Sequence, residues 1–165
     1  MKKSIFNITL SICFIVLFTF KTYSQNYKNA IGLRAGSYSG ITYKQFISPK
    51  AAFEIYGLLR FHKYYNQTNF TGVYQIHNNI PNANALKWYY GVGATVGLYG
   101  YQDGYFGKKT TGLSLGILGN LGLELTLREI PFCLALDWSP TYFLNNESGF
   151  YGDYAHFAVR YILGR

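Results

Sequence analysis

The sequence predicts an all-β fold, an eight-stranded antiparallel up-and-down transmembrane β-barrel that follows an N-terminal signal peptide. Three observations predict it. The chain opens with an apolar run that carries no charge beyond its short basic start. The rest of the chain alternates apolar residues with small or polar ones at a period of two, which is typical of strands. The connections between these segments are short at one end and long at the other, as in outer-membrane barrels.

The first segment of the chain predicts export. Residues 1–24 have the order of a secretory signal peptide, with a basic start, the apolar run 5–20 and a polar end before a cut in front of Gln25. This leaves residues 25–165 as one barrel domain. The run is about two residues short of the ~18 that a spanning helix needs, which disfavours an uncleaved anchor. A lipoprotein site at Cys13 is disfavoured because the apolar run continues beyond it.

Cleavage changes the composition of the mature chain. Cys133 stays as its one thiol, so no internal disulfide can form. Loss of Lys2, Lys3 and Lys21 lowers the net charge from +8 to +5. The longest basic run is the pair at positions 108–109, so the sequence predicts no nucleic-acid partner.

Eight segments of the mature chain show strand periodicity. In the third segment, Phe53 and Ile55 lie on one face and Glu54 and Tyr56 on the other. The first, second and fourth segments alternate less cleanly, and Gln45 interrupts the apolar face of the second. We predict strands at residues 30–37, 40–47, 53–61, 68–78, 86–99, 112–127, 132–139 and 156–163.

The fifth segment contains the stretch WYYGVGATVGLYGY, whose two faces differ in kind. Trp88 and Val92 belong to an apolar face, whereas Gly91, Gly93 and Gly97 lie on the other. Glycine weakens an ordinary strand, but a narrow closed barrel has room for only small groups inside. We therefore expect the glycines to face the lumen, with Trp88 toward lipid near the periplasmic interface.

The last three segments repeat this alternation. The sixth places leucine or isoleucine at alternate positions from Leu113 to Leu127, interrupted by Gly119. The seventh and eighth alternate from Phe132 and from Phe157. Their apolar faces carry leucine, aromatic and β-branched residues, which suits a half-buried strand.

The connections differ between the two ends of the predicted barrel. Tight turns are expected at 48–50 and 128–131, and a somewhat longer one at 79–85. The turn near 38–39 is short although it belongs to the other end. Long loops are expected at 62–67, 102–110 and 143–151.

The polar face decides which face points inward. Alternation alone does not exclude a soluble lipocalin-like barrel around a small apolar ligand, and this stays as the alternative. The polar face is mostly small residues, and only 13% of the chain is charged, which is poor for a water-facing surface. We therefore predict that the apolar face contacts lipid and that the charges of the other face form a lumen network. Its predicted members are Arg34, Lys44, Glu54, Arg60, Glu124, Asp137, His156 and Arg160.

Several segments carry a resemblance. GLRAG, GITYKQF, YQIHNNIPNANALKWYYGVGA, LGLELTLREIPFCLALDWSP and FAVRYIL resemble the small outer-membrane β-barrel proteins of Bacteroidota, which are loosely similar to OmpA-type eight-stranded barrels. The terminal pattern from Phe157 to Leu163 is similar to the strand that barrel-insertion machinery recognises, although the chain ends in Gly164 and Arg165. The resemblance implies an outer-membrane location, with outer-membrane lipid and the insertion machinery as partners.

The sequence favours no enzymatic chemistry. A rim-located lipid-modifying enzyme would use His, Ser and an acid, and the candidates are His62, Glu147, Ser148, Asp153 and His156. His156 is also explained as a lumen residue. The three histidines and the thiol have no metal-ligand spacing, so we expect neither metal nor cofactor.

The sequence also bears on a pore and on a binding role. A lumen of eight strands is filled by side chains, so we expect a monomer that is not a wide pore. His77 is expected to help fill it. Aromatic residues of the long loops, among them Phe143 and Phe150, suit a membrane girdle better than contacts with an external partner, which the sequence does not identify.

Overall fold

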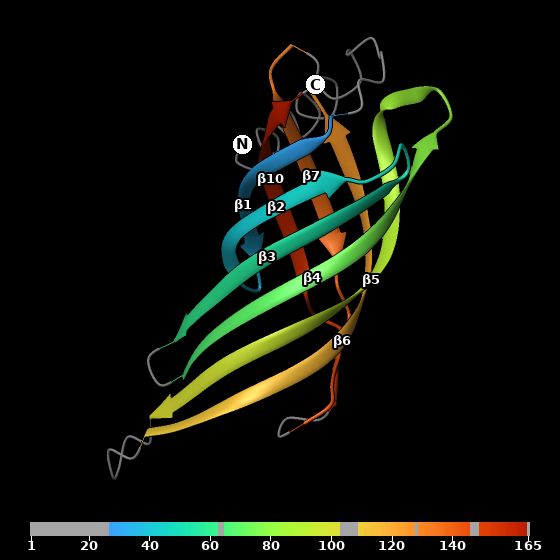
Figure 1. The fold of residues 1–165 in the computed structure, drawn as a ribbon. Coiled ribbons are helices and arrows are strands. Elements are labelled where there is room, and N and C mark those ends of the chain that lie inside the picture. The colour runs from blue at the N-terminus through green and yellow to red at the C-terminus, as the bar shows by residue number, and fades with distance from the viewer. Residues whose placement is uncertain (1–26, 63–64, 103–108, 128, 146–148, 165) are drawn as a thin grey trace, which may run out of the picture.

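The computed structural model is a closed antiparallel β-barrel (Figure 1). It describes residues 27–62, 65–102, 109–127, 129–145 and 149–164. The predicted signal peptide and its cleavage site lie outside these residues. Within them, no helix is long and apolar enough to cross a membrane, a finding that does not concern strands.

The strands begin and end close to the predicted positions at the short-turn end and extend further at the other. They are β1 (Asn29–Gly36), β2 (Ser39–Phe46), β3 (Ala51–His62), β4 (Tyr65–Ile80), β5 (Ala83–Gln102), β6 (Lys109–Thr126), β7 (Phe132–Trp138), β8 (Thr141–Phe143), β9 (Gly149–Tyr151) and β10 (Ala155–Gly164).

These ten segments make eight wall strands. Both β7 and β8 pair with β6, and a short interruption at Ser139 and Pro140 separates them. β9 pairs with β8, and β10 pairs with β7, so β9 and β10 form the next wall strand. The predicted eight-stranded all-β barrel is therefore confirmed.

Hydrogen bonding between neighbouring strands closes the barrel. The sheet runs β5-β4-β3-β2-β1-β10-β7-β6, and a further pairing between β5 and β6 joins its ends. β1 pairs antiparallel with β10, with Asn29 opposite Gly164, so the first and last strands meet at the short-turn end. A closed ring gives the strands' N–H and C=O groups partners, as a strand protein in lipid requires.

The hairpins at the long-loop end are longer than predicted. Pairing between β3 and β4 continues to His62 opposite Tyr65, and pairing between β5 and β6 continues to Gln102 opposite Lys109. Residues 62 and 65–67 of the first predicted loop, and residues 102, 109 and 110 of the second, are therefore strand. Backbone hydrogen bonds need no apolar side chains, so the ladder continues after the apolar pattern ends. In Figure 1 these hairpins reach past β1 and β2 toward the lower left.

Two other predicted connections are also shorter. The segment 79–85 is a tight turn at Pro81 and Asn82 between β4 and β5. Asn82 has a φ of 63°, a left-handed conformation that asparagine tolerates better than most residues. The predicted loop 143–151 contains β9, which pairs with β8 and so extends the wall.

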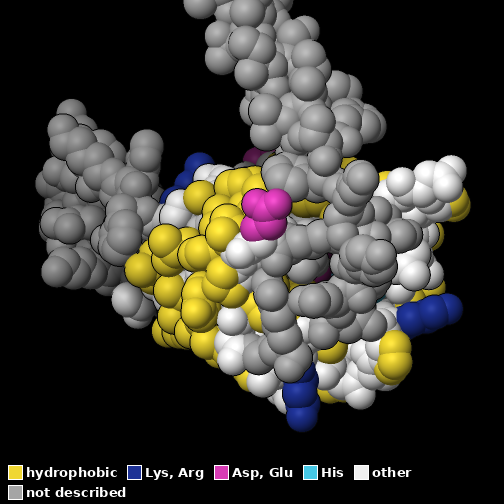
Figure 2. Space-filling view, turned by 90° about the horizontal axis from the view of Figure 1, so that it is seen from above, with side chains coloured by type: hydrophobic (Ala, Val, Ile, Leu, Met, Phe, Trp, Pro, Cys, Tyr) yellow, Lys and Arg dark blue, Asp and Glu magenta, His cyan; other side chains and the backbone are white. Residues whose placement is uncertain are grey.

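The barrel is apolar outside and polar inside. Arg34 and Glu54 are 1% and 0% exposed, whereas Leu33 and Val92 are 68% and 69% exposed. Figure 2 shows hydrophobic side chains gathered on one flank of the molecule as seen from above. A protein in water has the opposite arrangement. The prediction that the apolar face points away from the lumen is confirmed.

Gly91, Gly93 and Gly97 of β5 face inward, as predicted. A Cβ on Gly93 would lie 2.4 Å from the carbonyl oxygen of Gly72, and one on Gly97 would lie 2.3 Å from the Ser114 hydroxyl. Distances this short leave no room for a side chain. Gly57 and Gly72 instead lie on the outward faces of β3 and β4, against the aromatic rings of their neighbours.

Candidate functional site: the charged lumen

All eight wall strands contribute to one network of buried polar side chains. β4 contributes Gln75 and β5 contributes Tyr89, and the other six strands contribute one charged residue each. The ion pairs join three cations to three anions, and Lys87 of β5, also buried, lies opposite Glu124 in the β-ladder. The charged members are Arg34, Lys44, Glu54, Glu124, Asp137 and Arg160.

Glu54 lies at the centre of this network. Its carboxylate oxygens lie 3.4 Å from nitrogens of both Arg34 and Lys44. Arg160 contacts the same carboxylate from β10. All four side chains are 0% exposed. Charges removed from water so completely are tolerated only when they are paired and hydrogen-bonded.

Glu124 and Asp137 extend the network on either side. The Lys44 Nζ lies 2.8 Å from Glu124, and Arg160 lies 3.4 Å from the same carboxylate. Arg34 contacts Asp137. Each cation therefore bridges two carboxylates on different strands, which ties the wall together across the lumen.

Neutral side chains fill the remaining acceptor positions. The Thr42 hydroxyl donates to Glu54 at 2.6 Å, and the Gln75 amide donates to it at 2.8 Å. Tyr89 donates its hydroxyl hydrogen to Asp137 at 3.0 Å. Hydrogen bonds to ionised groups are stronger than neutral ones, so these donors offset part of the desolvation cost. Thr42 and Gln75 are network members that the prediction missed, although period-two alternation places both on the inward face.

An aromatic stack closes the short-turn end of the lumen. His77 lies between Phe46 and Tyr89, with 4.8 Å between ring centroids on each side. Tyr27, just before β1, packs edge-on against Phe46 at 5.0 Å and donates to Glu124 at 2.9 Å. Burial, and then the Glu124 carboxylate, raise the pKa of the Tyr27 phenol well above its ordinary value, so it stays a neutral donor. His77 therefore fills the lumen, as expected for it.

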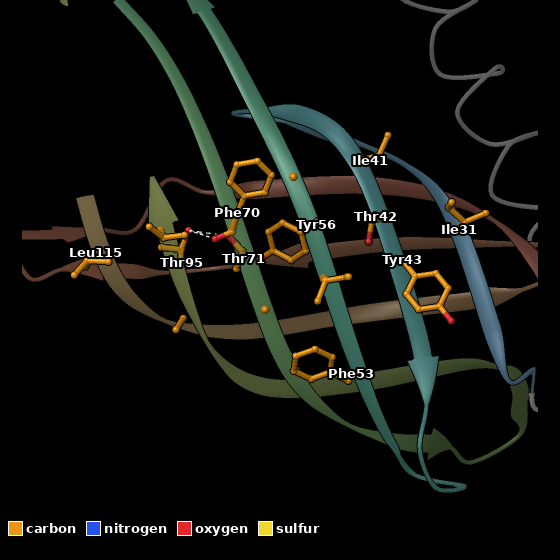
Figure 3. A pocket seen from close by; sticks show the side chains of 15 residues that line it. Ile31, Ile41, Thr42, Tyr43, Phe53, Tyr56, Phe70, Thr71, Thr95 and Leu115 are labelled. Atoms are coloured by element: carbon orange, nitrogen blue, oxygen red, sulfur yellow. Dashed lines mark hydrogen bonds between the residues drawn. The ribbon is translucent and has the colours of Figure 1, made fainter. Parts of the chain in front are cut away.

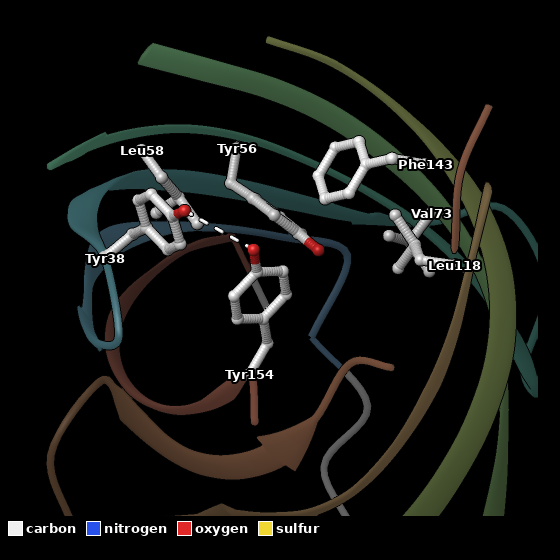
Figure 4. Packing of buried hydrophobic residues seen from close by; sticks show 7 residues of the cluster. All are labelled: Tyr38, Tyr56, Leu58, Val73, Leu118, Phe143 and Tyr154. Carbon is white, nitrogen blue, oxygen red and sulfur yellow. Dashed lines mark hydrogen bonds between the residues drawn. The ribbon is translucent and has the colours of Figure 1, made fainter. Parts of the chain in front are cut away.

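A second cluster fills the lumen on the long-loop side of the ion pairs (Figure 4). The Tyr38 hydroxyl donates to Gln67 at 2.9 Å and lies 3.4 Å from the Tyr154 hydroxyl. The space left beside this cluster is about 20 Å³, roughly room for one water. The buried hydrophobic members are Tyr38, Tyr56, Leu58, Val73, Leu118, Phe143 and Tyr154.

Two of the eight predicted network residues, Arg60 and His156, lie at the edge of the ion pairs. Arg60 is exposed, and its guanidinium lies over the Tyr38 ring at 5.3 Å. β2 begins at Ser39 opposite Leu59, so Arg60 lies beyond the end of the β1–β2 hairpin, where the short side of the wall has ended. Arg60 therefore lies exposed at the rim, outside the enclosed ion pairs.

His156 lies at the margin of the network. His156 is paired with Asp137 in the ladder between β10 and β7, and its Nδ1 lies 3.9 Å from the Asp137 carboxylate. Among the residues that the structure describes, neither ring nitrogen has a hydrogen-bond partner. His156 is 4% exposed, so it is enclosed with the ion pairs.

The described residues of the rim do not form a catalytic triad. A triad places histidine between the nucleophile and the acid. Here Asp137 lies between, because it accepts from Ser139 at 3.1 Å while His156 lies on its other side. Asp153 is exposed, and its backbone carbonyl oxygen accepts a hydrogen bond from the Ser37 hydroxyl at 3.1 Å. Glu147, Ser148 and the side chain of His62 lie outside the described part of the chain. Within that part, no three His, Cys, Asp or Glu side chains could hold a metal ion.

The long-loop aromatics separate into two groups. Phe150 is 67% exposed, as a girdle residue would be. Phe143 is 3% exposed and packs on Tyr151 with ring centroids 5.4 Å apart, so its assignment to the girdle was wrong. β8 turns this side chain into the lumen because it continues the wall strand past Pro140.

Comparison with solved structures finds the same fold elsewhere. The N-terminal β-barrel domain of Pseudomonas aeruginosa OprF is similar over 82% of this chain and 98% of that chain, with a TM-score of 0.64 and 13% identity. Neisserial surface protein A (NspA) is similar over 82% and 94%, with a TM-score of 0.52 and 11% identity. No protein-family model matches the sequence, and no curated protein does.

These observations define the class of the fold. The chain has the fold of an eight-stranded antiparallel β-barrel, similar to the barrels of OprF and NspA and closed by backbone pairing between β5 and β6. Its lumen contains ion pairs between two layers of aromatic side chains.

Proposed function

We propose that this protein is an outer-membrane β-barrel with a structural or surface-interaction role, and that it is neither a wide pore nor an enzyme. The observation that carries the proposal is that polar side chains lie inside the barrel and apolar side chains lie outside, the reverse of a protein in water. Ion-paired side chains are enclosed by the barrel, and its outer surface is leucine, isoleucine, valine and aromatic residues. Water would make that surface an aggregation patch, whereas lipid accommodates it.

Aromatic residues support the membrane location. Trp88 and Tyr90, near the short-turn end of β5, are both exposed, with ring centroids 5.6 Å apart. Phe132 and Tyr161 form a second pair 5.4 Å apart at the same end. Aromatic girdles of this kind seat a barrel at the interface between lipid and water. Trp88 is thus well placed for the periplasmic interface.

The soluble alternative is not favoured. A lipocalin-like barrel would need the leucine-rich face to line a cavity. That face is outward in the structure, and the lumen is occupied by ion pairs and aromatic rings. A rim-located enzyme is not favoured either, because the described rim residues do not place a histidine between a nucleophile and an acid.

We further propose that the chain is a monomer, exported by its signal peptide and inserted through recognition of β10. The resemblance of the sequence supports an origin in Bacteroidota.

Fractionation of cells that express the full chain tests the location. We expect the protein in the outer-membrane fraction, with a gel mobility that shifts when the sample is heated, because a closed barrel resists detergent until it is unfolded by heat. A periplasmic soluble pool with no mobility shift would contradict the proposal.

A further inference from the structure

An apolar hollow of about 820 Å³ lies on the outer wall of the barrel, across strands β1 to β6 (Figure 3). It runs across the strands, between two adjacent rows of outward-facing residues that the backbone register aligns. The first row is Ile31, Tyr43, Ile55, Gly72 and Ala94. The second row is Ile41, Gly57, Phe70, Val96 and Leu115.

Small residues create the hollow. Gly57, Gly72 and Ala94 occupy outward positions on three neighbouring strands, where most other outward residues are large. Phe70 stands beside Gly57, with a ring carbon 3.5 Å from where a Cβ would be, and Phe53 stands beside Gly72 at 3.3 Å. The two rings stand on either side of glycines that have no side chain, so the hollow results from the packing of the strands in the barrel wall.

The lining suits a hydrocarbon and offers little to a polar ligand. None of the fifteen lining residues is charged. Its threonines face the lumen, where the Thr71 hydroxyl donates to Thr95 at 2.8 Å. The outward side of the hollow therefore carries one side-chain hydroxyl, that of Tyr43. The occupant must therefore be apolar, because it would otherwise lose its hydrogen bonds to water without replacement.

The shape of the hollow suits one extended chain. From Ile41 on β2 to Leu115 on β6 it crosses four strand spacings of ~4.8 Å, or about 19 Å. The hydrocarbon of one membrane leaflet is about 15 Å deep, half of the ~30 Å core. A lipid tail and the hollow are therefore of similar length, and a volume near 820 Å³ lies within the ~300–1,000 Å³ of ligand pockets.

A second copy of the chain fits less well. A two-fold interface would place the same patch of both copies face to face. The two hollows would then face each other and leave a void, and the side chains lining it would lack the packing contacts that stabilise an apolar interface. A flexible lipid tail fills the hollow without that loss, and the hollow is continuous with the apolar belt.

We propose that this hollow is a binding site for one acyl chain of a membrane phospholipid. The inference rests on the proposed membrane location and adds to it a defined lipid site on the wall. A phospholipid bound there exchanges more slowly than the lipids around the rest of the barrel, because its tail lies between the two rows of side chains.

Variants that fill the floor test the site. Gly57→Leu and Ala94→Leu place a larger side chain in the hollow. Gly119→Leu is the matched control, since Gly119 lies on the outward face of β6, outside the hollow, and a Cβ there makes only an ordinary contact with Pro140 at 3.6 Å. Each protein is inserted into vesicles of phosphatidylethanolamine and phosphatidylglycerol and extracted in mild detergent. Native mass spectrometry then counts the phospholipids retained.

Wild type and Gly119→Leu are expected to retain one phospholipid per chain, and Gly57→Leu and Ala94→Leu to retain none. Equal retention by all four proteins would overturn the site. A dimer in wild type that only the filled variants lose would assign the hollow to a second copy instead. Wild type that inserts and shifts on a heated gel but retains no lipid would overturn this inference alone. Failure to insert into vesicles would overturn the proposed function as well.

Discussion

At the scale of single residues, the lumen depends on carboxylates that serve several partners at once. Glu54 accepts from Thr42 and Gln75 and pairs with three cations. Since all of these groups are desolvated together, removal of one charge leaves others uncompensated. The cost should therefore exceed that of any exposed substitution.

The variant Glu54→Gln tests this directly. It keeps the shape of the side chain but leaves the three cations with one carboxylate fewer. We expect the free energy of unfolding to fall by about 3–5 kcal/mol, the range for breaking a buried ion pair. Urea unfolding in vesicles, followed by tryptophan fluorescence, measures it. Asp153→Asn, at an exposed position, should stay within about 0.5 kcal/mol. Similar values for the two variants would show that the network does not stabilise the barrel.

At the scale of elements, each strand has separate requirements on its two faces. On β5 the inward face has no space at its glycines, whereas the outward face carries Trp88, Tyr90 and Leu98 into the apolar belt. The register between β5 and β6 places Tyr89 opposite Gly122 and Tyr99 opposite Gly112. A large side chain on one strand therefore fills the space over a glycine on the next.

Gly93→Ala should destabilise the barrel, because its Cβ would lie 2.4 Å from a carbonyl oxygen of β4. Overpacking of this kind costs about 1–3 kcal/mol. Gly100→Ala is the matched control on the same strand, where a Cβ would meet nothing within 4 Å. The fraction of each protein that shifts on a heated gel after refolding gives the comparison. An unaltered fraction for Gly93→Ala would mean that the wall yields more than the structure indicates.

Ile117→Arg tests the outward face. Ile117 lies on the apolar face of β6, is 55% exposed and pairs with Ala94, six residues along β5 from the interfacial Trp88. An arginine facing lipid near the membrane midplane costs about 2–4 kcal/mol, against about 0–1 kcal/mol near the interface. The yield of insertion into vesicles should therefore fall for Ile117→Arg but not for Glu129→Arg, at an exposed position in a short turn. Equal insertion of the two would indicate that this face does not contact lipid.

At the scale of the whole molecule, the filled lumen and the uneven wall are the main features. β1 and β2 have 8 residues each, whereas β5 and β6 have 20 and 18. One side of the barrel therefore extends beyond the other at the long-loop end. The lumen is filled in three layers from the short-turn end to the long-loop end. These are an aromatic stack, the ion pairs and a second aromatic cluster.

Permeability provides the test at this scale. Vesicles that contain the wild-type protein should show no swelling in sugar solutions, because the lumen is filled by side chains. The double variant Glu54→Ala with Arg160→Ala removes one charge of each sign from the centre, so ion conductance in planar bilayers should rise. Sugar uptake through the wild type would contradict the filled lumen. Unchanged conductance of the double variant would show that another layer controls passage.

The sequence alone determined the class of fold and the face on which most residues lie. Period-two alternation is a local property, so it placed Arg34, Glu54 and Glu124 inside and Leu123 outside without knowledge of any contact. Only the tertiary structure decided which charges meet, since Lys44 and Glu124 are 80 positions apart and reach each other across the lumen. It also decided where the wall ends and so excluded Arg60, and it created the hollow at Gly57 and Gly72. These features depend on the closure and stagger of the strands, which set distances between residues that no local pattern relates.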